Sequence, residues 1–328
     1  MAELSNEFNS SYNSNLYYDY YDYYTFICDH GSEAEYSHIA IPIIFSIVII
    51  LSLIGNVFVV GISVFSVRLQ SVIGIFILNL ALSDLLLTIG LLLWLCIYFW
   101  SWTFGVAGCK VSIFFSFVGF YSCIVFLVLM SVQRYIAVVH PFQRWKTGRC
   151  LNLVLVIVWL VSTLAALPAT VHVTLISEVN GIASYCGYSS ITASVAITYE
   201  EIIVFVCAYL GMFFFYIRIL QTILMSPTNQ RHTTTRLAFI LVVTYFICCA
   251  PYTIVNILVI LEYDESFLFR YCKGLGLPYV VYICQLLAFS HCCFNPLIYG
   301  LFSVKFRLTV REIFQRRATL NSAQMRMA

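Results

Sequence analysis

Charged residues are scarce in this sequence. Of its 328 residues only 10% are Asp, Glu, Lys or Arg, whereas 62% are hydrophobic. Soluble globular proteins have about 25% charged and about 45–50% apolar residues, so this chain has too few charges to cover a water-exposed surface. A surface that faces lipid needs no charge. The composition therefore excludes a soluble globular protein and indicates a membrane protein.

Sequence signatures of enzymes and of cleaved leaders are also missing. The N-terminus lacks a basic segment followed by an apolar one, so we expect no cleavable signal peptide. There is no HExxH motif, no Cys–His spacing typical of a zinc site and no internal repeat. The longest predicted cytoplasmic loop, around Ser226 to Arg236, is too short to hold an enzyme domain. We therefore expect no enzymatic activity.

Long apolar runs divide the chain into membrane spans. A helix of about 20 apolar residues crosses a bilayer. Such runs occur at about 39–66, 72–98, 107–135, 150–172, 195–223, 237–261 and 278–302. They predict an all-α membrane protein: a seven-transmembrane helix bundle over 39–302, after an acidic, Tyr-rich tail at 1–38. Residues 303–328 are predicted to form a short amphipathic cytoplasmic helix, with Phe306, Val310, Ile313 and Phe314 as its recurring apolar residues, and a short tail.

The basic residues predict the orientation of the bundle. With the N-terminus outside, fourteen of the seventeen Lys and Arg residues fall on the cytoplasmic side and thirteen of the fifteen acids fall on or near the outer side. Cytoplasmic loops of membrane proteins are enriched in Lys and Arg, so we expect an extracellular N-terminus in the plasma membrane. The acidic exterior predicts a basic extracellular partner; the alternative is that these acids only aid solubility.

The predicted outer tail carries a run of tyrosines beside carboxylates. Such tyrosines in a secreted segment are typical substrates of sulfation, and sulfates bind Arg and Lys well. We predict that this run binds the partner; the alternative is a low-complexity linker. The triplet that begins at Asn9 is a sequon for N-glycosylation. The predicted ligand-binding residues of the tail are Tyr17, Tyr18, Asp19, Tyr20, Tyr21 and Asp22.

Four of the thirteen cysteines fall at the predicted outer side. They are Cys28, Cys109, Cys186 and Cys272. An even number in an oxidising compartment predicts two disulfides, with three possible pairings. We expect the other nine cysteines to be small apolar packing residues.

Polar residues inside the spans are candidates for function. Placing the carboxyl group of Asp84 inside the second span costs several kcal/mol of free energy unless polar groups bond to it. Asn56, Asn295 and His291 are its candidate partners. It could hold a cation or a proton, or serve only as a structural hydrogen-bond node. Pro251 and Pro296 interrupt the sixth and seventh helices, which favours a bundle with two stable arrangements.

These residues resemble the rhodopsin-type G-protein-coupled receptors. The resemblance covers all seven spans and rests on matching residues in each: Gly55, Asn56, Leu80 to Asp84, Cys109, Arg134, Trp159, Tyr216, Pro251 and the NPLIY segment from Asn295 to Tyr299. Within that class, the segments WTFG from Trp102 and AFSHCCFNP from Ala288, with the extra cysteine pair, resemble chemokine receptors. The segments FILNLALSDL, VVTYF and VKFR are most similar to the XC-type subfamily, whose ligand is lymphotactin.

The resemblance implies a function and several sites. It implies a chemokine ligand, with a lymphotactin-like one favoured, and an inhibitory heterotrimeric G protein that drives chemotaxis and calcium mobilisation. It also implies the disulfides Cys109 to Cys186 and Cys28 to Cys272, and a sodium site at Asp84 and Asn295. Arrestin and membrane lipid are further candidate partners; no cofactor other than sodium and no nucleic acid are expected. The residues implied in coupling and activation are Gln133, Arg134, Tyr135, Tyr216, Pro251, Asn295, Pro296 and Tyr299.

The chain also departs from the family pattern. Gln133 stands where the family has an Asp before the Arg, and Cys249 where it has a Trp, which could raise basal activity or weaken coupling. Gln285 replaces a glutamate of the ligand pocket, so another anion is needed for a basic chemokine. Glu200 and Glu201 are the candidates, with Trp94 as an apolar wall; the alternative is that both acids lie at the membrane interface.

Three classes of function compete. A transporter or channel typically has several intramembrane charges and paired repeats, and an intramembrane enzyme needs a nucleophile with a base or a set of metal ligands. A signalling receptor accounts for the spans, the charge distribution and Arg134 together. The alternative function is a chemokine decoy or scavenger receptor that binds without signalling, which Gln133 and Cys249 keep open.

Overall fold

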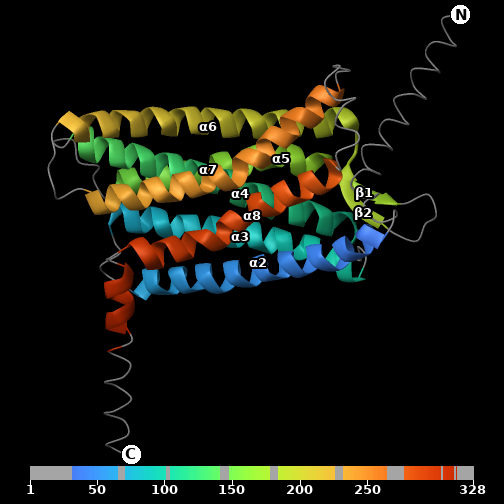
Figure 1. Ribbon diagram of the computed structural model, residues 1–328, viewed down its shortest axis with the longest axis horizontal. Coiled ribbons are helices and arrows are strands. Elements are labelled where there is room, and N and C mark those ends of the chain that lie inside the picture. Colours follow the sequence, from blue (N-terminus) through green and yellow to red (C-terminus); the bar gives the residue numbers. More distant parts are fainter. Residues whose placement is uncertain are drawn as a thin grey trace, which may run out of the picture.

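The computed structural model describes most of the predicted membrane region. The residues described are 32–65, 71–100, 104–140, 148–177, 184–225, 232–263, 277–303, 306–313 and 315. Seven long helices run roughly side by side (Figure 1). Their bounds are α2 Ser32–Phe65, α3 Val72–Trp100, α4 Gly105–Val139, α5 Arg149–His172, α6 Ile191–Met225, α7 His232–Tyr263 and α8 Leu277–Phe302.

These helices confirm the predicted seven-span bundle. Six of them contain a stretch long and apolar enough to cross a membrane. The seventh, α8, meets the same criterion over Ile283–Phe302 when the short helix that follows is counted with it. The apolar stretch of α2 begins at Pro42, within a helix that starts at Ser32.

Large apolar side chains cover the outside of the bundle. Ile54, Leu210 and Phe213 are each exposed over about two thirds of their surface. Such exposure is unfavourable in water, but hydrocarbon tails solvate these side chains well. The outer surface is therefore one that faces lipid, as the composition predicted.

Small residues let some helices approach closely. A methyl group on Gly119 of α4 would lie 2.5 Å from the backbone nitrogen of Leu87 in α3. On Gly55 of α2 it would lie 2.8 Å from Cγ of Pro296 in α8. Packing of this kind, rather than the hydrophobic effect, holds helices together in lipid.

A hairpin between α5 and α6 was not predicted from the sequence. Strands β1, Val173–Ser177, and β2, Ser184–Tyr188, pair antiparallel, with Leu175 opposite Cys186. The disulfide Cys109–Cys186, with Cα atoms 5.6 Å apart, attaches the hairpin to the start of α4. We call this the hairpin end of the bundle, and the opposite end, where Arg134 lies in α4, the arginine end.

A short helix over Phe306–Ile313 follows α8 at an angle of 83° (Figure 1). Phe306 is 5% exposed and its ring packs against Tyr299 of α8 and Phe58 of α2. Leu308 and Arg311 on this helix are exposed. The predicted amphipathic helix is thus present at the arginine end, anchored to the bundle by one buried aromatic ring.

Candidate functional site

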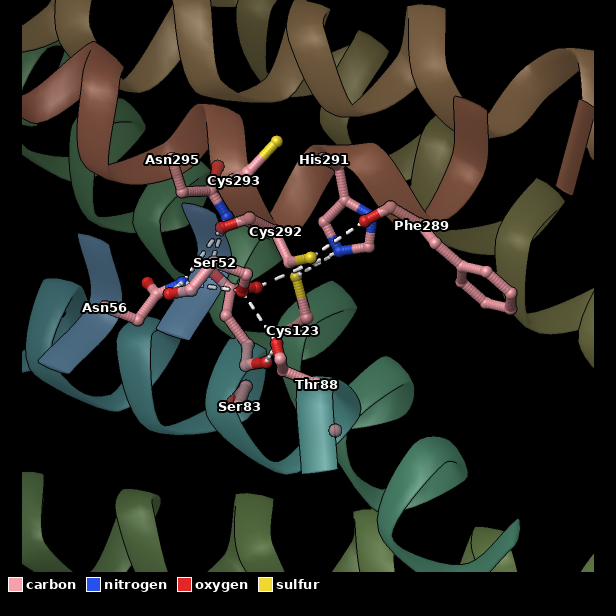
Figure 2. A network of polar contacts seen from close by, with 12 residues as sticks. Ser52, Asn56, Ser83, Thr88, Cys123, Phe289, His291, Cys292, Cys293 and Asn295 are labelled. Atoms are coloured by element: carbon pink, nitrogen blue, oxygen red, sulfur yellow. Dashed lines mark hydrogen bonds and ion pairs between the residues drawn. The ribbon is translucent and has the colours of Figure 1, made fainter. Parts of the chain in front are cut away.

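A cluster of polar side chains lies in the middle of the bundle, where α3, α4 and α8 meet. We call Asp84, Cys123, His291 and Asn295 the central polar cluster; Figure 2 shows the last three together with their surroundings. Asp84 is fully buried, and its Oδ2 accepts a hydrogen bond of 2.8 Å from Nδ2 of Asn295. Its Oδ1 has no hydrogen-bond partner among the described residues. Nε2 of His291 lies 3.8 Å from that oxygen.

Cys123 completes the cluster from α4. Its Sγ lies 3.7 Å from Nε2 of His291, and the two side chains point toward each other in Figure 2. The Sγ, the Nε2 and a carboxylate oxygen of Asp84 all lie within 4.8 Å of one another. His291 also shares a hydrogen bond between its Nδ1 and the carbonyl of Ala288. Three helices thus bring oxygen, nitrogen and sulfur atoms to one point.

A second layer of hydrogen bonds surrounds this cluster. Among the described residues Asn56 forms no hydrogen bond to Asp84, for which the sequence made it a candidate partner; its Nδ2 donates to the carbonyls of Ser52 at 3.0 Å and Cys292 at 2.9 Å. Oγ1 of Thr88 donates to the carbonyl of Asp84 at 2.6 Å and lies 2.6 Å from Oγ of Ser52. These contacts tie α2 to α3 and α8. They position the backbone on which the cluster is built.

Arg134 lies near the end of α4 and is only 7% exposed. Its Nε donates a 2.8 Å hydrogen bond to Oε1 of Gln133, the residue beside it. Tyr216 of α6 interacts electrostatically with Arg134. A neutral amide therefore occupies the place of an acidic partner. Arg134 is not held by a carboxylate anywhere in the described part of the chain.

Other residues predicted for coupling lie around the arginine end or in the helices that lead to it. The ring of Tyr135 packs against Phe215 of α6. Tyr299 is fully buried, and its hydroxyl has no hydrogen-bond partner among the described residues. Pro251 lies within α7 and Pro296 within α8, as predicted. The structure does not join all these residues into one site; they lie along the polar interior of the bundle.

Glu200 and Glu201 lie nearer the hairpin end, on α6. The helix begins at Ile191, so both acids are about 14–15 Å along its axis from that end. Glu201 is four residues from each of the buried Ile197 and Phe205, which places it on the inward-facing side. Both acids lie close enough to Tyr121 of α4 to interact with it electrostatically; Tyr121 is 2% exposed, and its hydroxyl makes no hydrogen bond of normal geometry within the described residues. This arrangement favours the pocket interpretation over the interfacial one.

Trp94 and Gln285 lie in a neighbouring part of the interior. Trp94 belongs to an apolar cluster between α2, α3 and α8, where its ring centroid is 5.3 Å from that of Phe45. Gln285 of α8 is half-buried, and its Oε1 is enclosed without a hydrogen-bond partner among the described residues. Of the predicted pocket residues, the structure brings only Glu200 and Glu201 together around Tyr121.

Several predicted sites lie outside the described residues. They are the tail residues Tyr17 to Asp22, the glycosylation site at Asn9, and the disulfide between Cys28 and Cys272. The first predicted disulfide, Cys109 to Cys186, is confirmed.

Sequence reasoning missed Tyr121 and Cys123. Tyr121 resembles the many aromatic residues that fill helix interfaces, and Cys123 was assigned to apolar packing. A signal was available for Cys123 alone: it is eleven residues before Arg134, so the two lie on the same side of α4.

Comparison with known proteins agrees with this architecture. Residues 55–299 match the family described as 7 transmembrane receptor (rhodopsin family), a family of receptors rather than enzymes. Human chemokine XC receptor 1 is 35% identical over 86% of this chain and 83% of its own length. Mouse chemokine XC receptor 1 is 36% identical over 92% and 91%.

A more distant similarity extends to a receptor of another type. Mouse atypical chemokine receptor 2 is 29% identical over 91% of this chain and 81% of its own length. The family match runs from within α2 to within α8 and includes the central polar cluster and Arg134. The chain therefore belongs to the rhodopsin family of seven-transmembrane receptors and, within it, to the chemokine receptors.

Proposed function

We propose that this receptor binds a basic chemokine, with a lymphotactin-like one favoured, and signals through an inhibitory heterotrimeric G protein. The N-terminus is extracellular in this proposal, so the hairpin end faces the ligand and the arginine end faces the G protein. The result of activation is chemotaxis and calcium mobilisation. The similarity to two XC receptors supports the ligand class.

The observation that carries the proposal is the inward position of Glu201. A carboxylate in the apolar interior is costly unless it serves an interaction, and acids there are typical of ligand sites. A basic chemokine terminus that reaches between the helices would supply the opposite charge. Glu200 beside it and the hydroxyl of Tyr121 provide further polar contacts. The tyrosines and acids of the tail would bind the folded body of the chemokine.

A path from this pocket to the arginine end runs through the central polar cluster. Tyr121, Cys123 and Arg134 are all buried residues of α4, which runs from the pocket past the central polar cluster to the arginine end. A ligand that shifts α4 or α6 at the pocket therefore changes the packing at Asp84 and at Arg134. A receptor couples two sites in this way when both ligands favour the same arrangement of the helices.

A second function is a decoy or scavenger that binds chemokine without signalling. The hydrogen bond from Arg134 to the neutral Gln133 supports it, because the arginine lacks the charged partner of the family pattern. The similarity to an atypical chemokine receptor supports it as well.

The deciding experiment is to express the full chain in mammalian cells with a panel of chemokines that includes lymphotactin. Binding and inhibition of cAMP formation are measured with and without pertussis toxin. We expect saturable binding and cAMP suppression that the toxin abolishes. Binding without a cAMP response would support the decoy function. Absence of binding to every chemokine would contradict the proposed ligand class.

The same assay tests the pocket. Loss of an ionic contact worth about 1.5–3 kcal/mol corresponds to a loss of roughly 10–150-fold in potency. We expect Glu201→Gln to weaken potency by at least about tenfold at equal surface expression, because the amide cannot pair with a cationic ligand. Glu312→Gln at the arginine end is the control and should leave potency unchanged. Equal potency of Glu201→Gln and the wild type would remove Glu201 from the pocket.

A further inference from the structure

A cation–π contact joins α7 to α8 at the arginine end. The guanidinium carbon of Arg236 lies over the ring of Phe302, 5.5 Å from the ring centroid. Arg236 lies near the start of α7, and Phe302 is the last residue of α8. The ring of Phe302 is partly buried and packs against the apolar core of the bundle. The contact therefore connects the beginning of α7 to a ring that the core holds in place.

Arg236 has no carboxylate partner. No acid pairs with it among the residues that the structure describes, and its side chain is exposed. Arg134, at the same end, also contacts a neutral group, the amide of Gln133. A ring attracts a cation through the negative charge on its face, so Phe302 can restrain Arg236 without a charge of its own. The two arginines are thus held by an amide and by a ring.

Pro251 allows α7 to bend at a point far from Arg236. Proline has no N–H to donate to the carbonyl four residues earlier. The hydroxyl of Thr253 donates to the carbonyl of Cys249 at 3.2 Å, a type of bond that often bends helices. Arg236 precedes Pro251 by fifteen residues, which corresponds to about 22 Å along the helix axis.

This length makes the contact sensitive to a small bend. A change of about 10° at Pro251 would move Arg236 by about 4 Å. A cation–π attraction is significant only when the cation is within about 6 Å of the ring centroid. The observed distance is 5.5 Å, so a bend of this size away from α8 would break the contact.

We propose that Arg236 and Phe302 are positioning residues that hold the first half of α7 against α8 and so oppose activation. The contact exists in the arrangement described here and is lost when α7 bends away, so it stabilises only one of the two arrangements. A cation–π contact at an exposed site shifts such a balance roughly two- to fivefold. The effect on signalling rests on the proposed coupling to a G protein, whereas the contact itself does not.

A double-mutant cycle in the full-length receptor, purified in detergent, tests the contact. Phe302→Leu keeps an apolar side chain but removes the aromatic face, and Arg236→Gln keeps a polar side chain but removes the charge. We expect each substitution to lower the melting temperature. The double variant should lose less than the sum of the two single losses, because the two side chains share one contact. Additive losses would overturn the proposal.

Ligand-independent nucleotide exchange on the inhibitory G protein, measured in membranes, tests the positioning role. We expect Phe302→Leu and Arg236→Gln each to raise this exchange roughly two- to fivefold. Phe302→Tyr retains the ring and should remain at the wild-type level. Arg218→Gln is the matched control, because Arg218 is also exposed at the arginine end but its guanidinium bonds to Gln221 at 3.3 Å. It should leave the exchange unchanged.

The two measurements separate this inference from the proposed function. Unchanged basal exchange in Phe302→Leu and Arg236→Gln, in a receptor that responds to a chemokine of the panel, would overturn the positioning role. A Phe302→Tyr receptor as active as Phe302→Leu would overturn it as well. A wild-type receptor without any G-protein response would instead contradict the proposed signalling. Non-additive losses in melting temperature would then still support the contact between α7 and α8.

Discussion

At the scale of single residues, the pair Gln133 and Arg134 sets how firmly the arginine end is held. The hydrogen bond from Arg134 to Gln133 is charge-assisted, because the guanidinium is ionised. A carboxylate at position 133 would add the attraction of a second, opposite charge, which the neutral amide of Gln133 does not supply. The guanidinium of Arg134 is thus less restrained than one paired with a carboxylate. It can more readily leave Gln133 and contact a partner protein at the arginine end.

We therefore expect Gln133→Asp to lower the basal activity of the receptor. A gain of about 1 kcal/mol in the contact would reduce the active population by roughly fivefold. Gln133→Asn is the control, because asparagine has the same shape as aspartate but no charge. It should leave basal activity near the wild-type level. The measurement is ligand-independent nucleotide exchange on the inhibitory G protein in membranes. Equal activity of the two variants would show that charge at this position is unimportant.

The sequence alone identified some residues of the central polar cluster and missed others. Asp84 was found because an acid within an apolar span is conspicuous, and Asn295 because it precedes a proline. Cys123 was missed, since a cysteine in an apolar run is most often a packing residue and its neighbour His291 is 168 residues away. Its spacing from Arg134 indicates only that it faces inward, and does not indicate what it contacts. What a sulfur atom contacts depends on how two helices rotate about their axes, which local sequence does not specify.

At the scale of elements, the helices followed from the sequence and the hairpin did not. Each predicted span is a run of over twenty mostly apolar residues, so a few polar residues within it do not obscure the pattern. Strands β1 and β2 have five residues each, so their pattern is too short to separate from a loop. Their stability comes from a disulfide to α4, a contact across 77 residues.

The contact between α3 and α4 gives a prediction for Gly119. The methyl group of Gly119→Ala would lie 2.5 Å from the backbone nitrogen of Leu87 and 2.7 Å from the carbonyl oxygen of Ser83. Backbone atoms cannot move aside singly, so the helices must separate. Overpacking of this kind costs about 1–3 kcal/mol, and we expect a lower melting temperature in detergent.

The matched control for this substitution is Gly211→Ala. Nothing lies within 4 Å of a methyl group there, and alanine favours a helix over glycine by about 1 kcal/mol. Its melting temperature should equal or exceed that of the wild type. Equal melting temperatures for the Gly119→Ala and Gly211→Ala receptors would show that α3 and α4 are not closely packed.

At the scale of the whole molecule, the charge is distributed unequally between the two ends. Of the seven basic residues whose side chains are described, six lie toward the arginine end: Arg134, Arg149, Arg218, Arg236, Arg307 and Arg311. Lys110, at the start of α4, lies toward the hairpin end. The distribution of Lys and Arg determines the orientation in which a membrane protein is inserted, and here it favours a cytoplasmic arginine end.

The orientation is testable with epitope tags at the two termini. We expect antibodies to label an N-terminal tag on intact cells and a C-terminal tag only after permeabilisation. The basic residues named above are the reason, because Lys and Arg near the spans are retained on the cytoplasmic side. Labelling of the C-terminal tag on intact cells would contradict both the orientation and the proposed place of the G protein.

The contact between α2 and α8 also has a consequence for biosynthesis. Asn56 in the first span donates to the carbonyl of Cys292 in the last, and 236 residues separate them. A ribosome that adds about 5–20 residues per second takes roughly 10–50 s to make that stretch. During this time the side-chain amide of Asn56 is in the membrane without its hydrogen bond to Cys292. The nascent receptor is thus incomplete until its last span has been inserted, so truncation within that span is a signal that cellular quality control can detect.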